Sequence, residues 1–404
     1  MKLGKRARLL LAASPLLIGF GAGCGDFWQA PATTTPPTCT TNCTTASSGN
    51  FYILNAGTTP QIVGESIVSG TLTALSGSPW TVEGTPYAMA MAPNGSFMVV
   101  STTSGVFAYP ITNGALGTAT VVSTDQAYAI KVDATDSWLL EALQGNGGVT
   151  IGAVPIVSTT GANNGSEQTV SFTVANAAVQ PNRLVISGDN SNIFVALGAG
   201  GTIVVPFNAN LAAGSSPFGT SPRATTIAVT NSSGSALSVA VDPGTTPRLF
   251  YVGETLANSA GNSGGLRAFD YSSLGTSTLT QAAGSPLSSG GLAPNFILPA
   301  ASGDFVYVAN GQGTSAAGNI TGFTITSSGT TTITYSLATD TSTAAGIQPL
   351  GLAEDSTDTF VLEVGSLGSP YFNSYTFDTT TLGQLDTQIT SSVAENSVAI
   401  VATP

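Results

Sequence analysis

Short apolar strands occur in pairs along the chain, and each pair is joined by a turn built on Asp, Asn or Gly. In the clearest copy, residues 87–92 are followed by the turn Pro93-Asn94-Gly95 and by the apolar run 97–100. The pattern returns about every 40 to 60 residues, which predicts a repeat architecture made of β-hairpins. The first strands of the further copies lie at residues 129–132, 184–186, 237–241, 296–298 and 350–353, and their second strands at 138–140, 193–195, 249–252, 305–308 and 360–362.

A seventh copy is divided between the two ends of the chain. Residues 397–401 have the pattern of a first strand with nothing after it, and residues 51–54 have that of a second strand with nothing before it. A radial array of four-stranded sheets closes in this way, because the two ends complete one sheet and leave no long edge unpaired. We therefore predict an all-β fold over residues 50–404, a seven-bladed β-propeller whose last blade is closed by the N- and C-terminal strands.

The first 24 residues have the features of an export signal. Four basic residues precede an apolar segment at 9–20, and the small residues of 21–23 lead to Cys24. This pattern predicts a lipoprotein-type signal in which Cys24 is lipidated and becomes the mature N-terminus. An ordinary secretory signal or a single N-terminal membrane anchor is the alternative. If Cys24 is lipidated, the protein lies at the cell envelope and its lipid holds it to a membrane.

Residues 25–49 are rich in Thr and Pro and cannot form a core, so we interpret them as a linker between anchor and propeller. Cys39 and Cys43 lie in this linker. In an oxidising compartment their spacing is typical of a small local disulfide. A zinc site there is disfavoured, since the spacing is unsuitable and the chain has no histidine to complete the ligand set.

Charge and composition restrict the chemistry. All 21 acidic residues but only five of the nine basic residues lie after Cys24, which gives that part a formal charge of −16 and makes nucleic acid a poor partner. The absence of histidine excludes Ser-His-Asp and Cys-His nucleophilic sites and His-ligated metals. We expect no cofactor and a monomer that binds a small molecule or an envelope protein.

The topology of a propeller suggests where a ligand site lies. Residues just before the first strands and just after the second strands are expected to meet at one face of the ring, where carboxylates and amides around one Arg would suit a polar small molecule. The alternative is that these side chains only cap strand ends. The candidates are Asn55, Tyr87, Glu141, Asn182, Arg183, Glu254, Asn295, Asn310 and Glu363.

The Asp-rich turns 133–136 and 355–358 have the composition of a calcium loop. They also fall where every repeat needs its hairpin turn, and Asp favours such turns because its side chain accepts hydrogen bonds from nearby backbone amides. We therefore predict no metal site.

Three groups of motifs support a resemblance. They are residues 305–310, the Gly-Ser-Pro loops at 77–79 and 284–286, and residues 113–116. In these motifs the chain resembles the seven-bladed lactonase-type propellers, which include phosphogluconolactonase and the carboxymuconate-lactonizing enzyme. Members that act on lactones have a Pro-Arg-His-like stretch entering a first strand and a Glu after a second strand. Here Pro181-Asn182-Arg183 and Glu254 match those places, but the histidine is missing.

Two functions from different classes follow. The first is binding of a small polar ligand or a protein partner at the cell envelope. The second is lactone hydrolysis, which the resemblance implies, with Glu254 as base and Arg183 holding a carboxylate or the developing oxyanion. In either case we expect Arg183 to be held by charge-assisted hydrogen bonds to the glutamates at positions 141, 254 and 363.

Overall fold

The computed structural model describes residues 49–404 except positions 69, 146, 175–178, 212–214, 258–262, 277, 314–315, 330–333, 379, 382 and 394. The predicted features at Cys24, Cys39 and Cys43, and nearly all of segments 1–24 and 25–49, lie outside these residues and stay predictions. None of the described segments forms a helix with the length and apolar character needed to cross a bilayer. The only described helical element is a single 3-10 turn, Tyr271–Ser273.

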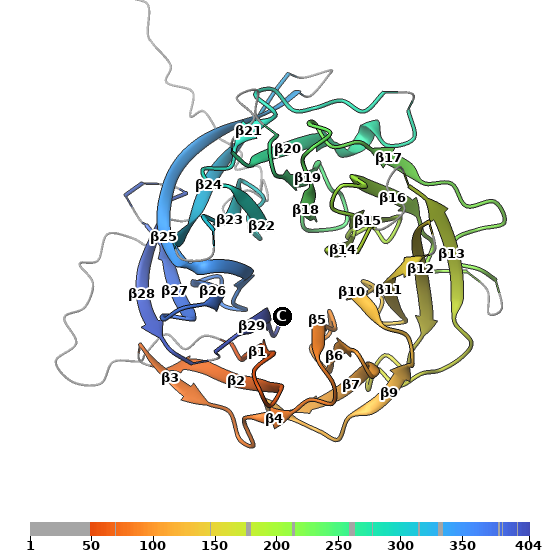
Figure 1. Ribbon diagram of the computed structural model, residues 1–404, viewed down its shortest axis with the longest axis vertical. Helices are drawn as coiled ribbons and strands as arrows, with labels where there is room; N and C mark the ends of the chain where they lie inside the picture. The colour runs from red at the N-terminus through yellow and green to blue at the C-terminus, as the bar shows by residue number, and fades with distance from the viewer. Residues whose placement is uncertain are drawn as a thin grey trace, which may run out of the picture. The chain divides into compact units, whose positions relative to one another are not determined.

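The described residues form antiparallel sheets arranged around a central space (Figure 1). The sheet that begins at residue 86 contains β5 (Pro86–Met91), β6 (Phe97–Thr102), β7 (Gly105–Thr112), β8 (Ala115–Leu116) and β9 (Thr120–Ser123). The next contains β10 (Ala127–Val132), β11 (Trp138–Gly145), β12 (Gly148–Pro155) and β13 (Gln168–Thr173). Each first strand lies on the inside of the ring, and the later strands of its sheet follow outward.

Two further sheets have the same four-stranded order. One contains β14 (Arg183–Ile186), β15 (Asn192–Ala196), β16 (Thr202–Pro206) and β17 (Thr225–Ile227). The other contains β18 (Ala236–Val241), β19 (Leu249–Glu254), β20 (Gly265–Asp270) and β21 (Leu287–Ser288). The predicted hairpins at residues 87, 129, 184 and 237 are thus confirmed.

A seven-stranded sheet follows, and one long strand connects its two parts. The sheet contains β22 (Ala293–Pro299), β23 (Phe305–Gly311), β24 (Ala317–Ser328), β25 (Thr334–Glu354), β26 (Phe360–Leu367), β27 (Phe372–Phe377) and β28 (Leu385–Ser391). The 21 residues of β25 pair with β24 in their first part and with β26 in their last part. In Figure 1 this strand curves along the outside of the ring and then turns inward.

The two ends of the propeller meet in one sheet. It contains β29 (Ser397–Ala402), β1 (Phe51–Asn55), β2 (Gln61–Val68) and β3 (Thr71–Ala74), with β4 (Trp80–Thr81) on β2. β29 pairs antiparallel with β1, with Ile400 opposite Ile53. The predicted closure by the terminal strands is confirmed.

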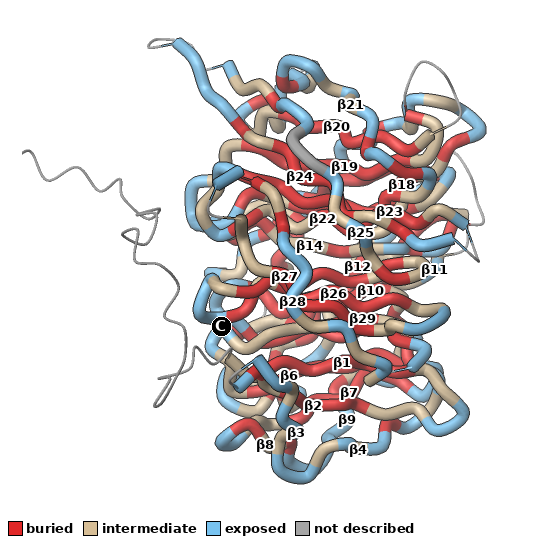
Figure 2. Tube along the Cα trace, turned by 90° about the vertical axis from the view of Figure 1, so that its left-hand side faces the viewer, coloured by how far each residue is buried: buried red, intermediate tan, exposed pale blue. Residues whose placement is uncertain are grey.

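The hydrophobic core is distributed between neighbouring sheets rather than gathered in one place. One buried cluster joins Phe97 and Val99 to Val132 and Leu139, and another joins Phe194 to Phe250. The inner strands follow one another around the ring, and β29 returns to β5. Figure 2 shows buried strands throughout the body of the protein, with exposed residues concentrated in the connecting loops.

Candidate functional site

The inner strands enclose a central cavity of about 570 Å³. Its walls are mostly aliphatic because small and apolar residues dominate these strands. The lining includes Lys131 on β10 and Arg183 on β14, and no acidic side chain belongs to it. A second hollow of about 400 Å³ adjoins it, is also lined by Lys131, and contains Glu354, Asp355 and Asp358.

Arg183 crosses the cavity rather than pairing with an acid. Its guanidinium carbon lies 3.7 Å from the centre of the Phe296 ring on β22, although β18 separates β14 from β22 in the ring. Stacking on an aromatic face satisfies the cation through the ring's electron density and leaves the N–H edge able to donate hydrogen bonds. Within the described part of the chain, no carboxylate forms an ion pair with Arg183 or Lys131.

Both cations are destabilised by their position in the cavity. Burial, followed by repulsion from Arg183, lowers the pKa of Lys131 to about 8. Burial also lowers the pKa of Arg183 to about 10. Burial disfavours the positive charge of both side chains. An anion bound between them would favour their charged forms.

Three of the predicted polar candidates line the same cavity. Tyr87 packs on Tyr128 with ring centres 4.8 Å apart, and burial together with Tyr128 raises the pKa of Tyr87. Asn182 donates to the carbonyl of Ala236 at 3.0 Å, and Asn295 donates to that of Pro349 at 2.9 Å. Both amides therefore link one inner strand to the next, as well as facing the cavity.

The other five candidates do not line the cavity. They lie at the ends of second strands, which pair with the starts of first strands as expected: Asn310 lies opposite Pro294, and Glu254 opposite Ala236. Their side chains, however, are buried within and between the sheets, with at most 3% of each exposed: Asn55, Glu141, Glu254, Asn310 and Glu363. The prediction that three glutamates hold Arg183 is wrong. Side chains along a strand point alternately to the two faces of its sheet, and in this ring both faces pack against neighbouring sheets. The second strand of each sheet also lies farther from the cavity than the first strand.

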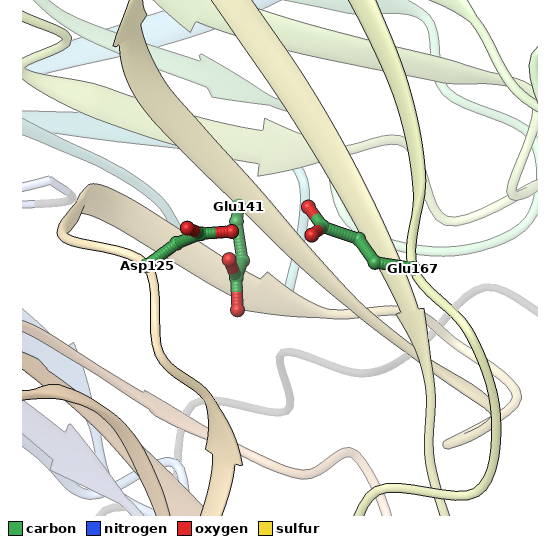
Figure 3. Close-up of side chains that lie close together, drawn as sticks. All are labelled: Asp125, Glu141 and Glu167. Atoms are coloured by element: carbon green, nitrogen blue, oxygen red, sulfur yellow. The ribbon is translucent and has the colours of Figure 1, made fainter.

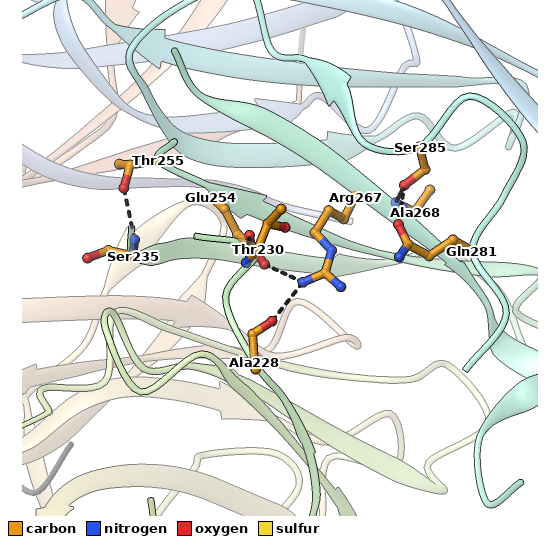
Figure 4. A network of polar contacts seen from close by, with 9 residues as sticks. All are labelled: Ala228, Thr230, Ser235, Glu254, Thr255, Arg267, Ala268, Gln281 and Ser285. Carbon is orange, nitrogen blue, oxygen red and sulfur yellow. Dashed lines mark hydrogen bonds and ion pairs between the residues drawn. The ribbon is translucent and has the colours of Figure 1, made fainter. Parts of the chain in front are cut away.

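Glu254 forms an ion pair with Arg267 instead of Arg183. One carboxylate oxygen accepts from Arg267 Nη1 at 2.7 Å, and the other accepts from the Thr230 amide at 2.8 Å. Arg267 also donates to the Ala228 carbonyl (Figure 4). With both oxygens engaged and the side chain buried, Glu254 is placed as a structural ion pair and is poorly placed as a base for chemistry in the cavity.

The remaining buried candidates have fewer partners. Glu363 accepts from the Asn373 side chain and from the Gly346 amide, whereas Glu141 accepts from Ser123 at 3.2 Å. Burial raises the pKa of Glu363 to about 7, and burial with repulsion from nearby acids raises that of Glu141 to about 8.

The two buried asparagines are held less completely. The amide of Asn310 donates to the carbonyls of Ser289 and Val308, while Oδ1 of both Asn310 and Asn55 is buried without a hydrogen-bond partner. Neither side chain reaches the cavity lining.

The Asp-rich turns are held by their own backbone. Asp133 Oδ1 accepts from the amides of Ser137 and Trp138 at 2.7 Å, and its Oδ2 accepts from Thr135 and from Asn190 of the next hairpin. Asp355 accepts in the same way from the amides of Thr357, Thr359 and Phe360. These contacts favour the turn interpretation over the calcium loop, because the carboxylate oxygens already accept hydrogen bonds.

Lys131 is the cavity residue that the sequence reasoning missed. The signal was its place between Ile130 and Val132 in a first strand, where alternation directs it toward the ring's interior surface. Only the closed ring shows that Lys131 borders a central cavity.

Comparison with known proteins supports the fold. The chain matches no protein-family model and no curated protein. Among solved structures, a "putative 6-phosphogluconolactonase" from Bacteroides uniformis is similar with a TM-score of 0.64 and 18% identity, over 87% of this chain and 98% of that one. A protein from Lactobacillus plantarum is similar with a TM-score of 0.64 and 16% identity, over 88% and 99%.

A third similar structure is the beta-propeller domain of Cps50 (Swd1) from Myceliophteria thermophila, with a TM-score of 0.54 and 11% identity over 80% of this chain and 91% of that one. Likenesses at these identities concern the fold. The chain has an all-β propeller fold, which it shares with these structures.

Proposed function

We propose that the propeller binds a small polar ligand carrying an anionic group in its central cavity. The observation that carries this proposal is the pair Arg183 and Lys131, which line the cavity without a carboxylate partner among the described residues. The part of the chain after Cys24 has only three other basic residues. Arg248 and Arg267 pair with acids, and Arg223 is exposed.

Three polar residues of the cavity lining complete a site for a polar molecule. Tyr87, Asn182 and Asn295 contribute a hydroxyl and two amides to the same lining. Aliphatic walls with a few convergent polar groups are the usual composition of a small-molecule site. A carboxylate or phosphate between the two cations would replace their mutual repulsion with charge-assisted hydrogen bonds.

Lactone hydrolysis is the second candidate. It is favoured by the likeness of the fold to that of the 6-phosphogluconolactonase-type protein from Bacteroides uniformis and by the place of Arg183, which would hold a substrate carboxylate or the developing oxyanion. The base assigned to Glu254 is disfavoured by its ion pair with Arg267. Binding without turnover is therefore the function that we prefer.

Two further features belong to this proposal. We infer seven blades, because β25 serves as the outer strand of one blade and the inner strand of the next, so that the seven-stranded sheet comprises two blades. We also propose that the propeller is exported and anchored by lipid at Cys24, on the strength of the signal in residues 1–24.

The binding test uses the propeller, residues 50–404, with inorganic phosphate, gluconate and 6-phosphogluconate as probes in isothermal titration. We expect at least one probe to bind, and Arg183→Met or Lys131→Met to weaken it by tenfold or more, about 1.4 kcal/mol. Arg223→Met, at an exposed loop position, is the matched control and should bind like the native protein.

The same proteins are then assayed with gluconolactone and other small lactones. Hydrolysis above the uncatalysed rate that is lost in Arg183→Met would favour the enzyme over the binding protein. Equal binding of all three probes by the native protein and by Arg183→Met would contradict an anion site in the cavity.

A further inference from the structure

Three carboxylates come together away from the cavity. Oxygen atoms of Asp125, Glu141 and Glu167 all lie within 4.8 Å of one another (Figure 3). Asp125 follows β9 of one sheet, whereas Glu141 on β11 and Glu167 just before β13 belong to the next sheet. The cluster therefore lies where two neighbouring sheets meet.

The negative charges of this cluster have little compensation. Glu141 is fully buried, its Oε1 has no hydrogen-bond partner, and its Oε2 accepts only from Ser123. Oε1 of Glu167 is also buried without a partner. The basic residues after Cys24 are all described, and none forms an ion pair with the three acids. A buried unpaired carboxylate is costly, and three in contact are more so.

The chain contains an internal comparison for Glu141. The sequences Asp133-x-Thr-Asp-x-Trp-Leu-Leu-Glu141 and Asp355-x-Thr-Asp-x-Phe-Val-Leu-Glu363 place two glutamates at the same point of their hairpins. Opposite Glu363 on the third strand is Asn373, whose amide donates to it. Opposite Glu141 is Gly152, which has no side chain to donate.

Gly152 also makes room for the third acid. A Cβ at this position would lie 2.1 Å from Oε1 of Glu167 and 3.5 Å from Cβ of Glu141. The absence of that carbon lets the Glu167 carboxylate lie over the sheet beside Glu141. One residue thus removes the donor that the equivalent glutamate has and admits another negative charge in its place.

We propose that Asp125, Glu141 and Glu167 bind a calcium ion that joins the two sheets. Calcium takes carboxylate oxygens at 2.3–2.6 Å, so opposite ligands lie up to about 5 Å apart, and the three oxygens here lie within 4.8 Å of one another. Magnesium, at 2.0–2.1 Å, would require about 4.2 Å at most. Asp125 and Glu167 are half-buried, so water can complete the coordination shell.

Thermal unfolding of the propeller after treatment with a chelator tests this site. Adding calcium at millimolar concentration should raise Tm by at least about 3 °C, since binding to the folded state alone stabilises it. Magnesium should have a smaller effect. Asp125→Asn and Gly152→Asn should each abolish most of the calcium response. The first removes one of the negative charges that attract the cation, and the second displaces Glu167 and gives Glu141 an amide donor.

Glu363→Gln is the matched control, because it changes the equivalent buried glutamate outside the cluster, and its calcium response should equal that of the native protein. Titration calorimetry should give a calcium affinity at least tenfold weaker for Asp125→Asn. No calcium response in the native protein would overturn the proposal, and so would an equal response in Gly152→Asn. Asp125 lies on a half-buried loop, so its variant keeps the test decisive if the core variants fold poorly.

Discussion

At the scale of single residues, the same hairpin sequence produces two buried glutamates with different surroundings. Asp133 and Asp355 stabilise their hairpin turns by accepting hydrogen bonds from backbone amides. Glu141 and Glu363 follow these aspartates by eight residues. Glu363 then lies among neutral donors, whereas Glu141 lies among other acids. The identity of one residue on the third strand, Asn373 or Gly152, decides which of these environments forms.

Glu363 predicts a pH dependence of stability. Burial raises its pKa from an ordinary 4.5 to about 7, so the folded protein binds a proton more tightly than the unfolded chain does. Its contribution to stability is therefore complete below about pH 4.5 and is lost as the pH rises through 7. Between pH 4.5 and 8 the free energy of unfolding should fall by roughly 2–3 kcal/mol on account of this group.

Urea unfolding at pH 4.5, 6 and 8, in a buffer with chelator, measures this effect. The side chain introduced by Glu363→Gln cannot titrate. The free energy of unfolding of this variant should therefore fall less between pH 4.5 and pH 8 than that of the native protein. Glu395→Gln changes an exposed glutamate and should behave like the native protein. Parallel pH curves for the native protein and Glu363→Gln would show that the carboxyl has an ordinary pKa.

At the scale of elements, the sheets are connected by packing between them and by the terminal strand. β29 pairs with β1 along its length, and Ile400 is buried in a cluster with Phe51 and Ile53. Phe51 in turn stacks on Phe372 of β27, with ring centres 5.3 Å apart. The short strand β1 therefore contacts β29 within its own sheet and β27 in the neighbouring sheet.

Deletion of residues 395–404 should destabilise the whole ring by several kcal/mol. The deletion leaves the backbone groups of β1 unpaired on one side and removes the buried side chains of Ala399 and Ile400. Calorimetry of the truncated protein should show a large fall in Tm. Deletion of the exposed Pro404 alone is the control and should leave Tm unchanged. A Tm within a few degrees of the intact protein for the longer deletion would contradict closure by β29.

At the scale of the whole molecule, the charge distribution separates two regions. The part after Cys24 has a formal charge of −16, yet two of its five cations line the central cavity, whose described lining contains no acidic residue. An anionic ligand would approach against the overall field and be held by local contacts inside, where salt screens charges weakly. The proposed calcium site lies elsewhere, at a junction between sheets, and would serve stability rather than the cavity.

The proposed anchor concerns the protein as a whole. Metabolic labelling with a palmitate analogue should mark the native full-length chain and should not mark Cys24→Ala, because the thiol is the only proposed attachment point. Cys39→Ala is the control, since its thiol lies in the proposed linker and its loss should leave labelling intact. Equal labelling of the native chain and Cys24→Ala would rule out lipidation at that residue.

The hairpins, their turns and the closure by the terminal strands could be predicted from the amino-acid sequence. These features depend on local alternation, on Asp and Gly at the turns, and on a pattern divided between the two ends, all of which can be recognised without knowing which strands lie side by side. Tyr87, Asn182, Arg183 and Asn295 were singled out for their position at the start of first strands, and the structure has them in the lining of the central cavity. Their role in binding a ligand stays a prediction.

The contacts between charged side chains could not be predicted, because they form between strands and sheets that are packed together in the fold. Glu254 finds Arg267 on the adjacent strand, Arg183 reaches Phe296 across the ring, and Glu141 meets Asp125 and Glu167 at a junction between two sheets. These contacts depend on which face of a strand each side chain occupies and on how one sheet packs on the next. The stacking of Arg183 on Phe296 and the cluster around Glu141 therefore could not be predicted from spacing along the chain.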